Sequence, residues 1–267
     1  GYAGQVERAI LRLDHAMEDL SEVALGGTAV GTGVNAHQEF STRTCARLSK
    51  QVGLTVRETE NHFQAQNSLD GVVEASGVLR TVATSMYKIA NDIRWLGSGP
   101  RAGIGEITLP EVQPGSSIMP GKVNPVIAES VIQVVAQVIG NDATIAMSGQ
   151  GGYFELNMMM PVAAYNILQS ASLLATSATN FTEQCVIGIG ATNAGPDLVE
   201  RGLMLGTALA PAIGYDKAAS IAKQAAKDGR TIREVAREEA GLLEEDLNLL
   251  LKPEKMTEPG LGSGGGG

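Results

Sequence analysis

Residues 72–96, VVEASGVLRTVATSMYKIANDIRWL, contain the pattern that decides the fold class. Apolar residues recur there at alternating intervals of three and four positions: Val72, Ala75, Leu79, Val82, Met86, Ile89, Ile93 and Leu96. This spacing is typical of the seam along which long helices pack lengthwise. It predicts a helix of about 25 residues or more, about 38 Å long. Gly97, Gly99 and Pro100 are expected to end it.

Further helices are expected on both sides of this stretch. Residues 5–25 have helical periodicity and stop at a pair of glycines, and residues 38–51 are expected to form a helix that ends at Gly53. Asn124 is a good N-cap and Pro125 suits the first position of the helix that follows. Because that helix is apolar on most faces, we expect it to be central and buried.

The last third of the chain changes character. A further helix is expected at 161–185, and from about residue 194 the segments become shorter and more highly charged. No stretch sustains the alternation of a strand. We therefore predict an all-α protein with a long-helix bundle in residues 1–193, a small C-terminal helical domain in residues 194–258, and a Gly-rich tail or linker in residues 259–267.

The composition limits the classes of partner. Hydrophobic residues make up 43% of the 267 residues and the net charge is −9, so the chain is globular and acidic, a poor match for nucleic acid or an anionic membrane. Residues 156–182 carry no charge, but their Asn, Gln, Ser and Pro residues favour a buried helix over a membrane span. Two cysteines make no disulfide framework. With no signal-peptide pattern, this favours a cytoplasmic location.

The stretch GSSIMPGKVNP, residues 115–125, is the strongest candidate site. Ser116 and Ser117 place hydroxyl groups on a glycine-rich backbone, and Lys122 is the only basic residue between Arg101 and Arg201. A helix N-terminus follows, and its free N–H groups and dipole favour anions. Hydroxyl, ammonium and amide groups at such a terminus suit a carboxylate substrate. The alternative is a surface loop with a solvated lysine.

Glu129 adds to this candidate site. It lies early in the apolar helix and begins a polar stripe at intervals of four residues, continued by Gln133, Gln137 and Asn141. A buried carboxylate is costly unless it is paired, so Glu129 is expected to hold a histidine or lysine from elsewhere. A structural ion pair between helices is the alternative interpretation.

Other sequence features suggest no further chemistry. His15, His37 and His62 lack the spacing of metal ligands, and the glycine-rich stretches lack the lysine of a phosphate-binding loop. Cys45 and Cys185 lie in helical patterns without an activating basic neighbour. We therefore expect neither a metal nor an organic cofactor.

Residues 115–125 resemble the signature loop of the fumarase/aspartase superfamily. Flanking stretches, including GGTAVGTGVNAHQEF (26–40), KIANDIRWLGSGPRAGIGEI (88–107) and FELNMMMPV (154–162), are similar to class II fumarate hydratases. The resemblance covers residues 1–258. KVNPVIAE and LKPEKMTEPG also occur in aspartase-like relatives, so aspartate ammonia-lyase stays open as an alternative. A non-catalytic helical scaffold for oligomerisation is a second alternative.

The resemblance implies reversible anti addition of water to fumarate, a reaction of the tricarboxylic acid cycle. It implies that Ser116 is the base at C3 and that Lys122 and Asn124, with Ser117 beside them, bind a substrate carboxylate. Glu129 would pair with a histidine. The family's active sites combine three subunits of a homotetramer, and two further motif regions lie upstream of the point that matches Gly1. We therefore expect a C-terminal portion that is incomplete alone, with a companion N-terminal chain as one source of the rest.

Overall fold

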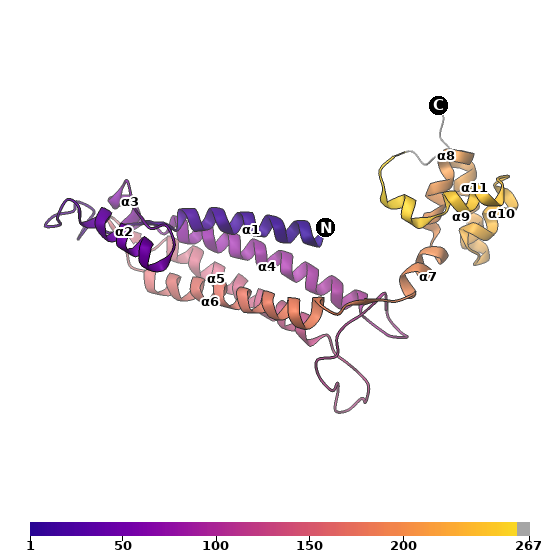
Figure 1. Cartoon of the computed structure of the whole chain (residues 1–267), viewed down its shortest axis with the longest axis horizontal. Helices are drawn as coiled ribbons and strands as arrows, with labels where there is room; N and C mark the ends of the chain where they lie inside the picture. The colour runs from indigo at the N-terminus through magenta and orange to yellow at the C-terminus, as the bar shows by residue number, and fades with distance from the viewer. Residues whose placement is uncertain (261–267) are drawn as a thin grey trace. The chain divides into compact units, whose positions relative to one another are not determined.

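The computed structural model describes residues 1–260, and the chain folds as two compact units (Figure 1). The first unit consists of Gly1–Gly97 and Leu109–Ile189, and the second consists of Ser98–Thr108 and the residues from Gly190 onward. The domain bounds of 1–193 and 194–258 remain predictions, although residues 98–108 belong to the second unit here. Of the expected tail at 259–267, residues 261–267 lie outside the described part.

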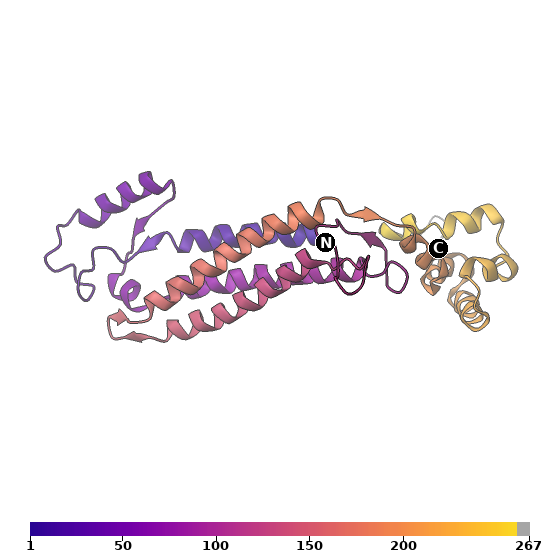
Figure 2. The same cartoon turned by 90° about the horizontal axis from the view of Figure 1, so that it is seen from below.

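Long helices form the first unit. They are α1 (Tyr2–Asp19), α4 (Asp70–Leu96), α5 (Val126–Gly149) and α6 (Met160–Phe181), which a π-helical turn, η1 (Thr182–Val186), continues. These helices run side by side in Figures 1 and 2. The shorter helices α2 (Phe40–Val52) and α3 (His62–Asn67) lie between α1 and α4 in the sequence. The predicted all-α fold class is confirmed.

Small buried residues along α4 let its neighbours approach closely. Ala83 and Ala90 are completely buried, and Ala75, Ile89 and Ile93 are nearly so. Ala83 and Ala90 lie beside the predicted seam, and the seam residues other than Ala75, Ile89 and Ile93 are half-buried. Interhelical distance depends on the side chains at the contact, so a line of alanines favours close packing along the whole helix.

Several helix boundaries differ from the sequence prediction. α1 ends at Asp19, not near residue 25. α5 begins at Val126, with Pro125 in the N-cap position and no side-chain cap from Asn124. Pro125 has ψ 57°, outside helical values, so the helix starts one residue later than expected. α2 does end as predicted, at Gly53, whose left-handed conformation (φ 71°) suits glycine.

The described residues include three ladders of two residues each, two of which connect loops that are distant in the sequence. β1 (Glu22–Val23) pairs in parallel with β2 (Arg57–Glu58), and β4 (Gly152–Tyr153) forms a hairpin with β5 (Leu156–Asn157). In the second unit, β3 (Ile107–Thr108) pairs antiparallel with β6 (Gly190–Ala191). Two residues are too few to show the alternation by which strands are predicted, so these ladders were not expected.

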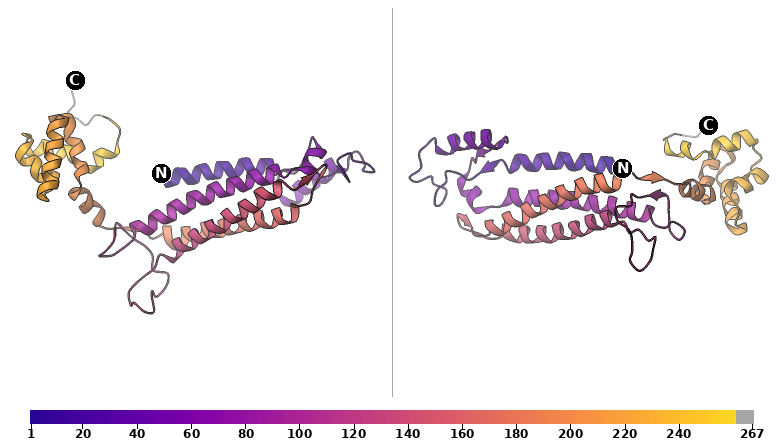
Figure 3. Two further views of the ribbon diagram at one scale, coloured as in Figure 1. Left: turned by 180° about the vertical axis from the view of Figure 1, so that it is seen from behind. Right: turned by 60° about the horizontal axis from the view of Figure 1, so that its bottom comes forward.

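The second unit is a cluster of short helices (Figure 3). They are α7 (Ala194–Arg201), η2 (Leu203–Leu209), α8 (Ala210–Ile213), α9 (Tyr215–Asp228), α10 (Ile232–Glu239), α11 (Glu244–Leu250) and η3 (Pro253–Thr257). Aliphatic residues from most of these helices make one buried core, which includes Leu205, Ile221, Ile232 and Leu247. A capping box between Thr231 and Glu234 begins α10.

Among the described residues, α5 alone is long and apolar enough to cross a membrane by length and composition. Its buried Asn141 and Asp142 hydrogen-bond to side chains of neighbouring helices. Such contacts are those of a bundle helix. The helix expected to be central and buried does pack against both α4 and α6, but it is only partly buried in this single chain, since Ile139 and Met147 are exposed.

Candidate active site

The candidate loop, residues 115–125, leads directly into α5. It belongs to the part of the α4–α5 connection, from Leu109 onward, that lies in the first unit and extends away from the helices (Figure 3). Apolar side chains occupy its tip: Ile118 is 92% exposed and Met119 is also exposed. The loop therefore presents its side chains to solvent on this chain and not to the bundle core.

Backbone hydrogen bonds close the base of this loop. The Ser116 N–H donates to the Lys122 carbonyl oxygen over 2.9 Å, and the Lys122 N–H donates to the Met119 carbonyl oxygen over 3.2 Å. Gly115 and Gly121 have positive φ angles of 87° and 80°, which make the reversals of direction. The closure places the predicted base, Ser116, opposite the predicted cation, Lys122.

The Ser116 hydroxyl lies under two backbone donors. The N–H groups of Ile118 and Met119 each lie 3.3 Å from Ser116 Oγ and donate to it. Amide dipoles aimed at an oxygen stabilise negative charge on it. The arrangement can therefore support a serine that acts as a base, which a free hydroxyl does poorly.

The predicted carboxylate-binding groups are available for a ligand. Lys122 and Ser117 are exposed, and Asn124 is half-buried beside the start of α5. Within the described part of the chain, no hydrogen bond or ion pair holds the Lys122 ammonium or the Asn124 amide. An ammonium and an amide next to a helix N-terminus form a favourable environment for an anion.

Glu129 lies in the first turn of α5 and is half-buried. No other described residue forms an ion pair or hydrogen bond with its carboxylate. The alternative of a structural ion pair between helices of this chain is therefore not realised among these residues. Any partner of the Glu129 carboxylate would therefore lie outside the described residues.

The polar stripe on α5 divides into two parts. Glu129 and the exposed Gln133 stand apart, whereas Gln137 donates to Asn141 over 2.9 Å. Asn141 is 2% exposed and donates to Gln169 and Ser170 of α6. The far end of the stripe is thus a buried polar contact between helices.

A second polar contact, which was not predicted from the sequence, lies next to this one. Asp142 accepts a hydrogen bond from Ser76 Oγ over 2.7 Å and pairs with Arg80 over 2.6 Å. Ser76 and Arg80 lie on one face of α4, one turn apart. A polar Ser–x–x–x–Arg spacing next to a helical seam was the available signal.

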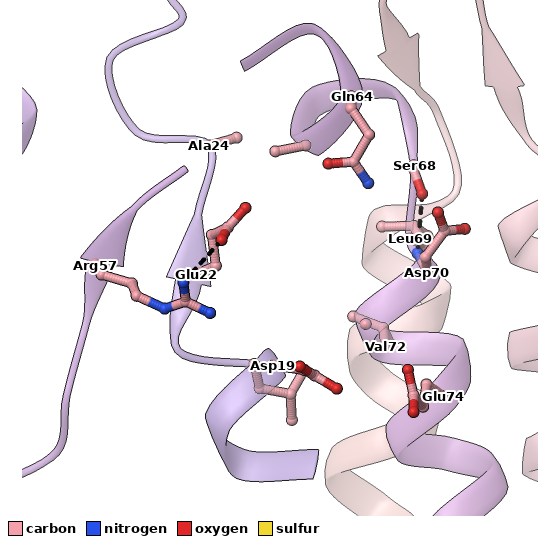
Figure 4. Close-up of a pocket in the computed structure, with 13 residues that line it drawn as sticks. Asp19, Glu22, Ala24, Arg57, Gln64, Ser68, Leu69, Asp70, Val72 and Glu74 are labelled. Atoms are coloured by element: carbon pink, nitrogen blue, oxygen red, sulfur yellow. Dashed lines mark hydrogen bonds and ion pairs between the residues drawn. The ribbon is translucent and has the colours of Figure 1, made fainter. Parts of the chain in front are cut away.

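The cavity drawn in Figure 4 lies at the other end of α4 from the candidate loop. It has a volume of about 410 Å³, and carboxylates of Asp19, Glu22, Asp70 and Glu74 line it. The guanidinium of Arg57 is already bonded to Glu22 and Ser21. Negative charge therefore dominates this cavity, which disfavours an anionic substrate.

The histidines remain separate from the candidate loop. Among the described residues, no group of three or more His, Cys, Asp and Glu side chains is placed to hold a metal ion. His62 Nε2 contacts the Leu25 carbonyl oxygen at 3.1 Å and Glu58 at 3.4 Å, which ties α3 to the loop after β1.

Models of known protein families match both ends of the chain. Residues 1–140, which contain the candidate loop and Glu129, match a lyase family model, and residues 205–258 match the model of the fumarase C C-terminus. A class II fumarate hydratase from Neisseria meningitidis serogroup A is 49% identical over 97% of the chain and 56% of its own length.

Solved structures agree in fold. The class II fumarase from Schistosoma mansoni superposes with a TM-score of 0.92 at 35% identity, over 97% of this chain and 57% of that one. A fumarate lyase:delta crystallin from Brucella melitensis gives 0.91 at 46% identity, over 97% and 56%. The chain thus spans a little more than half the length of the relatives that it matches. With the lyase model matching more than half of its residues, the chain belongs to the lyase family and is similar to the C-terminal portion of class II fumarate hydratases.

Proposed function

We propose that the complete protein is a fumarate hydratase, which adds water reversibly to fumarate to give L-malate. This proposal is carried by the Ser116 hydroxyl, which accepts hydrogen bonds from two backbone amides. Its loop lies within residues 1–140, which match the lyase family model. The names of the most similar relatives support hydration of fumarate over other lyase reactions. A dicarboxylate is therefore the proposed substrate.

The loop chemistry fits proton removal beside a carboxylate. In the dehydrating direction, the Ser116 alkoxide takes the proton from C3 of malate, and the electron pair of the C–H bond moves into the adjacent carboxylate. The resulting aci-carboxylate carries extra negative charge, which the Lys122 ammonium and the α5 N-terminus stabilise. The C2–O bond then breaks, and the hydroxyl group leaves as water with a proton from a general acid outside this sequence, while Ser116 releases the C3 proton to solvent and so returns to the alkoxide.

The other site residues have supporting roles in this proposal. The Asn124 amide and the Ser117 hydroxyl hold a substrate carboxylate together with Lys122. Glu129, which has no partner among the described residues, orients a histidine supplied from outside this sequence. The proposed mechanism therefore needs groups that the chain alone does not supply, and the chain alone is expected to turn over little or no fumarate.

A homotetramer is the proposed assembly, with a cytoplasmic location. The assembly is supported by apolar side chains that are exposed on the long helices. These include Met147 on α5 and Tyr165 and Leu168 on α6. Large apolar side chains left exposed on packed helices are typical of interaction sites. Light scattering at micromolar concentration tests the assembly, and a monomer would contradict it.

The activity is tested on the full-length polypeptide that contains this chain. Loss of fumarate is followed by ultraviolet absorbance, with and without ammonium. Turnover in its absence, with malate as the product, is the expected result. Turnover that requires ammonium would assign an aspartate ammonia-lyase instead, and no turnover by the tetrameric protein would favour the scaffold alternative.

A further inference from the structure

We propose that Gly115 is a positioning residue for this reaction, because its backbone closes against that of Lys122 and so fixes the backbone that carries the Ser116 hydroxyl relative to the backbone that carries the Lys122 side chain. The inference rests on the proposed function for its catalytic consequence. Its structural basis, the contact between Gly115 and Lys122, is independent of the reaction.

The contact leaves no room for a side chain at Gly115. A Cβ atom there would lie 2.5 Å from the Lys122 carbonyl oxygen and 3.1 Å from its carbonyl carbon. Both atoms belong to the backbone, so they cannot move aside as a flexible side chain would. The same carbonyl oxygen accepts the Ser116 N–H over 2.9 Å. Any side chain at residue 115 is therefore expected to push the Lys122 backbone away from Ser116 and to break this hydrogen bond.

Gly121 provides a matched control in the same loop. Its φ of 80° is close to the 87° of Gly115, but no atom lies within 4 Å of the position that its Cβ would take. Gly121 is therefore needed only for its backbone conformation, whereas Gly115 is needed for conformation and for space. Asparagine tolerates positive φ better than alanine does. Asparagine should thus relieve the strain at residue 121 but not at residue 115.

We call the close backbone contact between Gly115 and Lys122, with its Ser116–Lys122 hydrogen bond, the clasp. It matters because Ser116, the proposed base, and Lys122, the proposed cation, act on the same substrate. Lys122 holds the carboxylate that receives charge, and Ser116 must reach the neighbouring carbon atom. A displacement of about 1 Å between catalytic groups can cost about 10²-fold in rate. Opening the clasp should therefore slow the chemical step more than it weakens substrate binding.

The test uses the full-length enzyme with Gly115→Ala, Gly115→Asn, Gly121→Ala and Gly121→Asn. Both Gly115 variants should lower kcat by about 10²-fold with a change in KM below about tenfold. Gly121→Asn should keep kcat within about threefold of the parent, and Gly121→Ala should lie between these extremes. A role confined to stability would lower the thermal midpoint and leave kcat per folded enzyme unchanged.

Amide hydrogen exchange at Ser116 supplies a readout that needs no activity. Exchange should be faster in both Gly115 variants, since they lose the bond to the Lys122 carbonyl, and unchanged in Gly121→Asn. Equal exchange and equal kcat in Gly115→Asn and Gly121→Asn would overturn the proposal. If the unsubstituted full-length protein hydrates no fumarate, the proposed function fails, and the exchange comparison still decides whether the clasp exists.

Discussion

Two residues of α4, Ser76 and Arg80, bind the two carboxylate oxygens of Asp142 on α5. Arg80 Nη1 lies 2.6 Å from one carboxylate oxygen, and Ser76 Oγ lies 2.7 Å from the other. The Asp142 side chain is only 9% exposed, whereas that of Arg80 is 55% exposed. The pair therefore joins a buried charge to a solvated one across the interface of the two helices.

Arg80→Ala should lower the free energy of unfolding by about 1–2 kcal/mol, since it leaves a buried carboxylate with one partner. The loss should be smaller than for a fully buried pair, because water already screens the exposed guanidinium. Urea unfolding measures it. The double variant Arg80→Ala, Asp142→Asn removes the unpaired charge and should recover part of the loss. Equal stability of parent and Arg80→Ala would contradict a stabilising pair.

Ser116→Ala in the full-length enzyme should lower kcat by roughly 10²–10⁴-fold, as expected for loss of a general base. Ser117→Ala is the matched control and should cost less, because its hydroxyl has no part in proton transfer. Steady-state kinetics measure both, and circular dichroism should show an unchanged helical fold. Near-parental turnover by Ser116→Ala would remove this serine from the role of base.

The second unit should lose stability in acid. A hydrogen bond from the Thr231 backbone N–H, and then one from its hydroxyl, lowers the pKa of Glu234 below the ordinary glutamate value of 4.5. A hydrogen bond from Arg230 lowers the pKa of Glu238 in the same way. Because the folded pKa values are depressed, their contribution to stability is present above about pH 4.5 and is lost as the pH falls through the folded values.

Urea unfolding of this unit at a series of pH values checks the prediction. The unfolding midpoint should be flat above about pH 5 and should fall below that, and Glu238→Gln should flatten the fall. A fall of the same steepness in Glu238→Gln and in the parent would show that this carboxylate does not contribute.

Both thiols should resist modification in the native protein. Burial raises the pKa of the Cys185 thiol, and burial followed by the negative charge of Glu58 raises that of Cys45. Less thiolate forms near neutral pH, so a disulfide reagent such as Ellman's reagent should react slowly until the protein unfolds. Rapid release of chromophore at pH 7 without denaturant would show that a thiol is accessible and ionised.

Local patterns in the sequence predicted the long helices well because each pattern reports its own element. The three-four spacing of α4 needs no knowledge of its neighbours, and Gly53 ends α2 by its own conformation. Boundaries set by tertiary packing were less accurate. The start of α5 moved from Pro125 to Val126 because the backbone of Pro125 is not yet helical.

The candidate loop could also be found from sequence, since its residue types are grouped within eleven positions. Its closure could not, because the Ser116–Lys122 bond depends on the path of the backbone. The Asp142 contacts were missed for another reason: Ser76 and Arg80 lie more than sixty residues away, and only the packing of α4 on α5 brings them together. Periodicity identifies a face but not its partner.

The β3–β6 ladder has a consequence for how the polypeptide matures during synthesis. Ile107 pairs with Ala191, so one strand of the second unit leaves the ribosome before α5 and α6 exist and its partner follows them. Packing of α5 against α6 reduces the length of free chain between β3 and β6. In the folded chain Gly188 lies close to Pro110, since a Cβ atom at residue 188 would lie 3.1 Å from Pro110 Cγ, so the residues next to β3 and β6 are near each other. The entropic cost of closing a loop rises with the logarithm of its free length, so prior folding of the α5–α6 hairpin should lower the entropic cost of pairing β3 with β6. The β3–β6 ladder is therefore expected to form only after α5 and α6 have packed together, although β3 precedes both helices in the sequence.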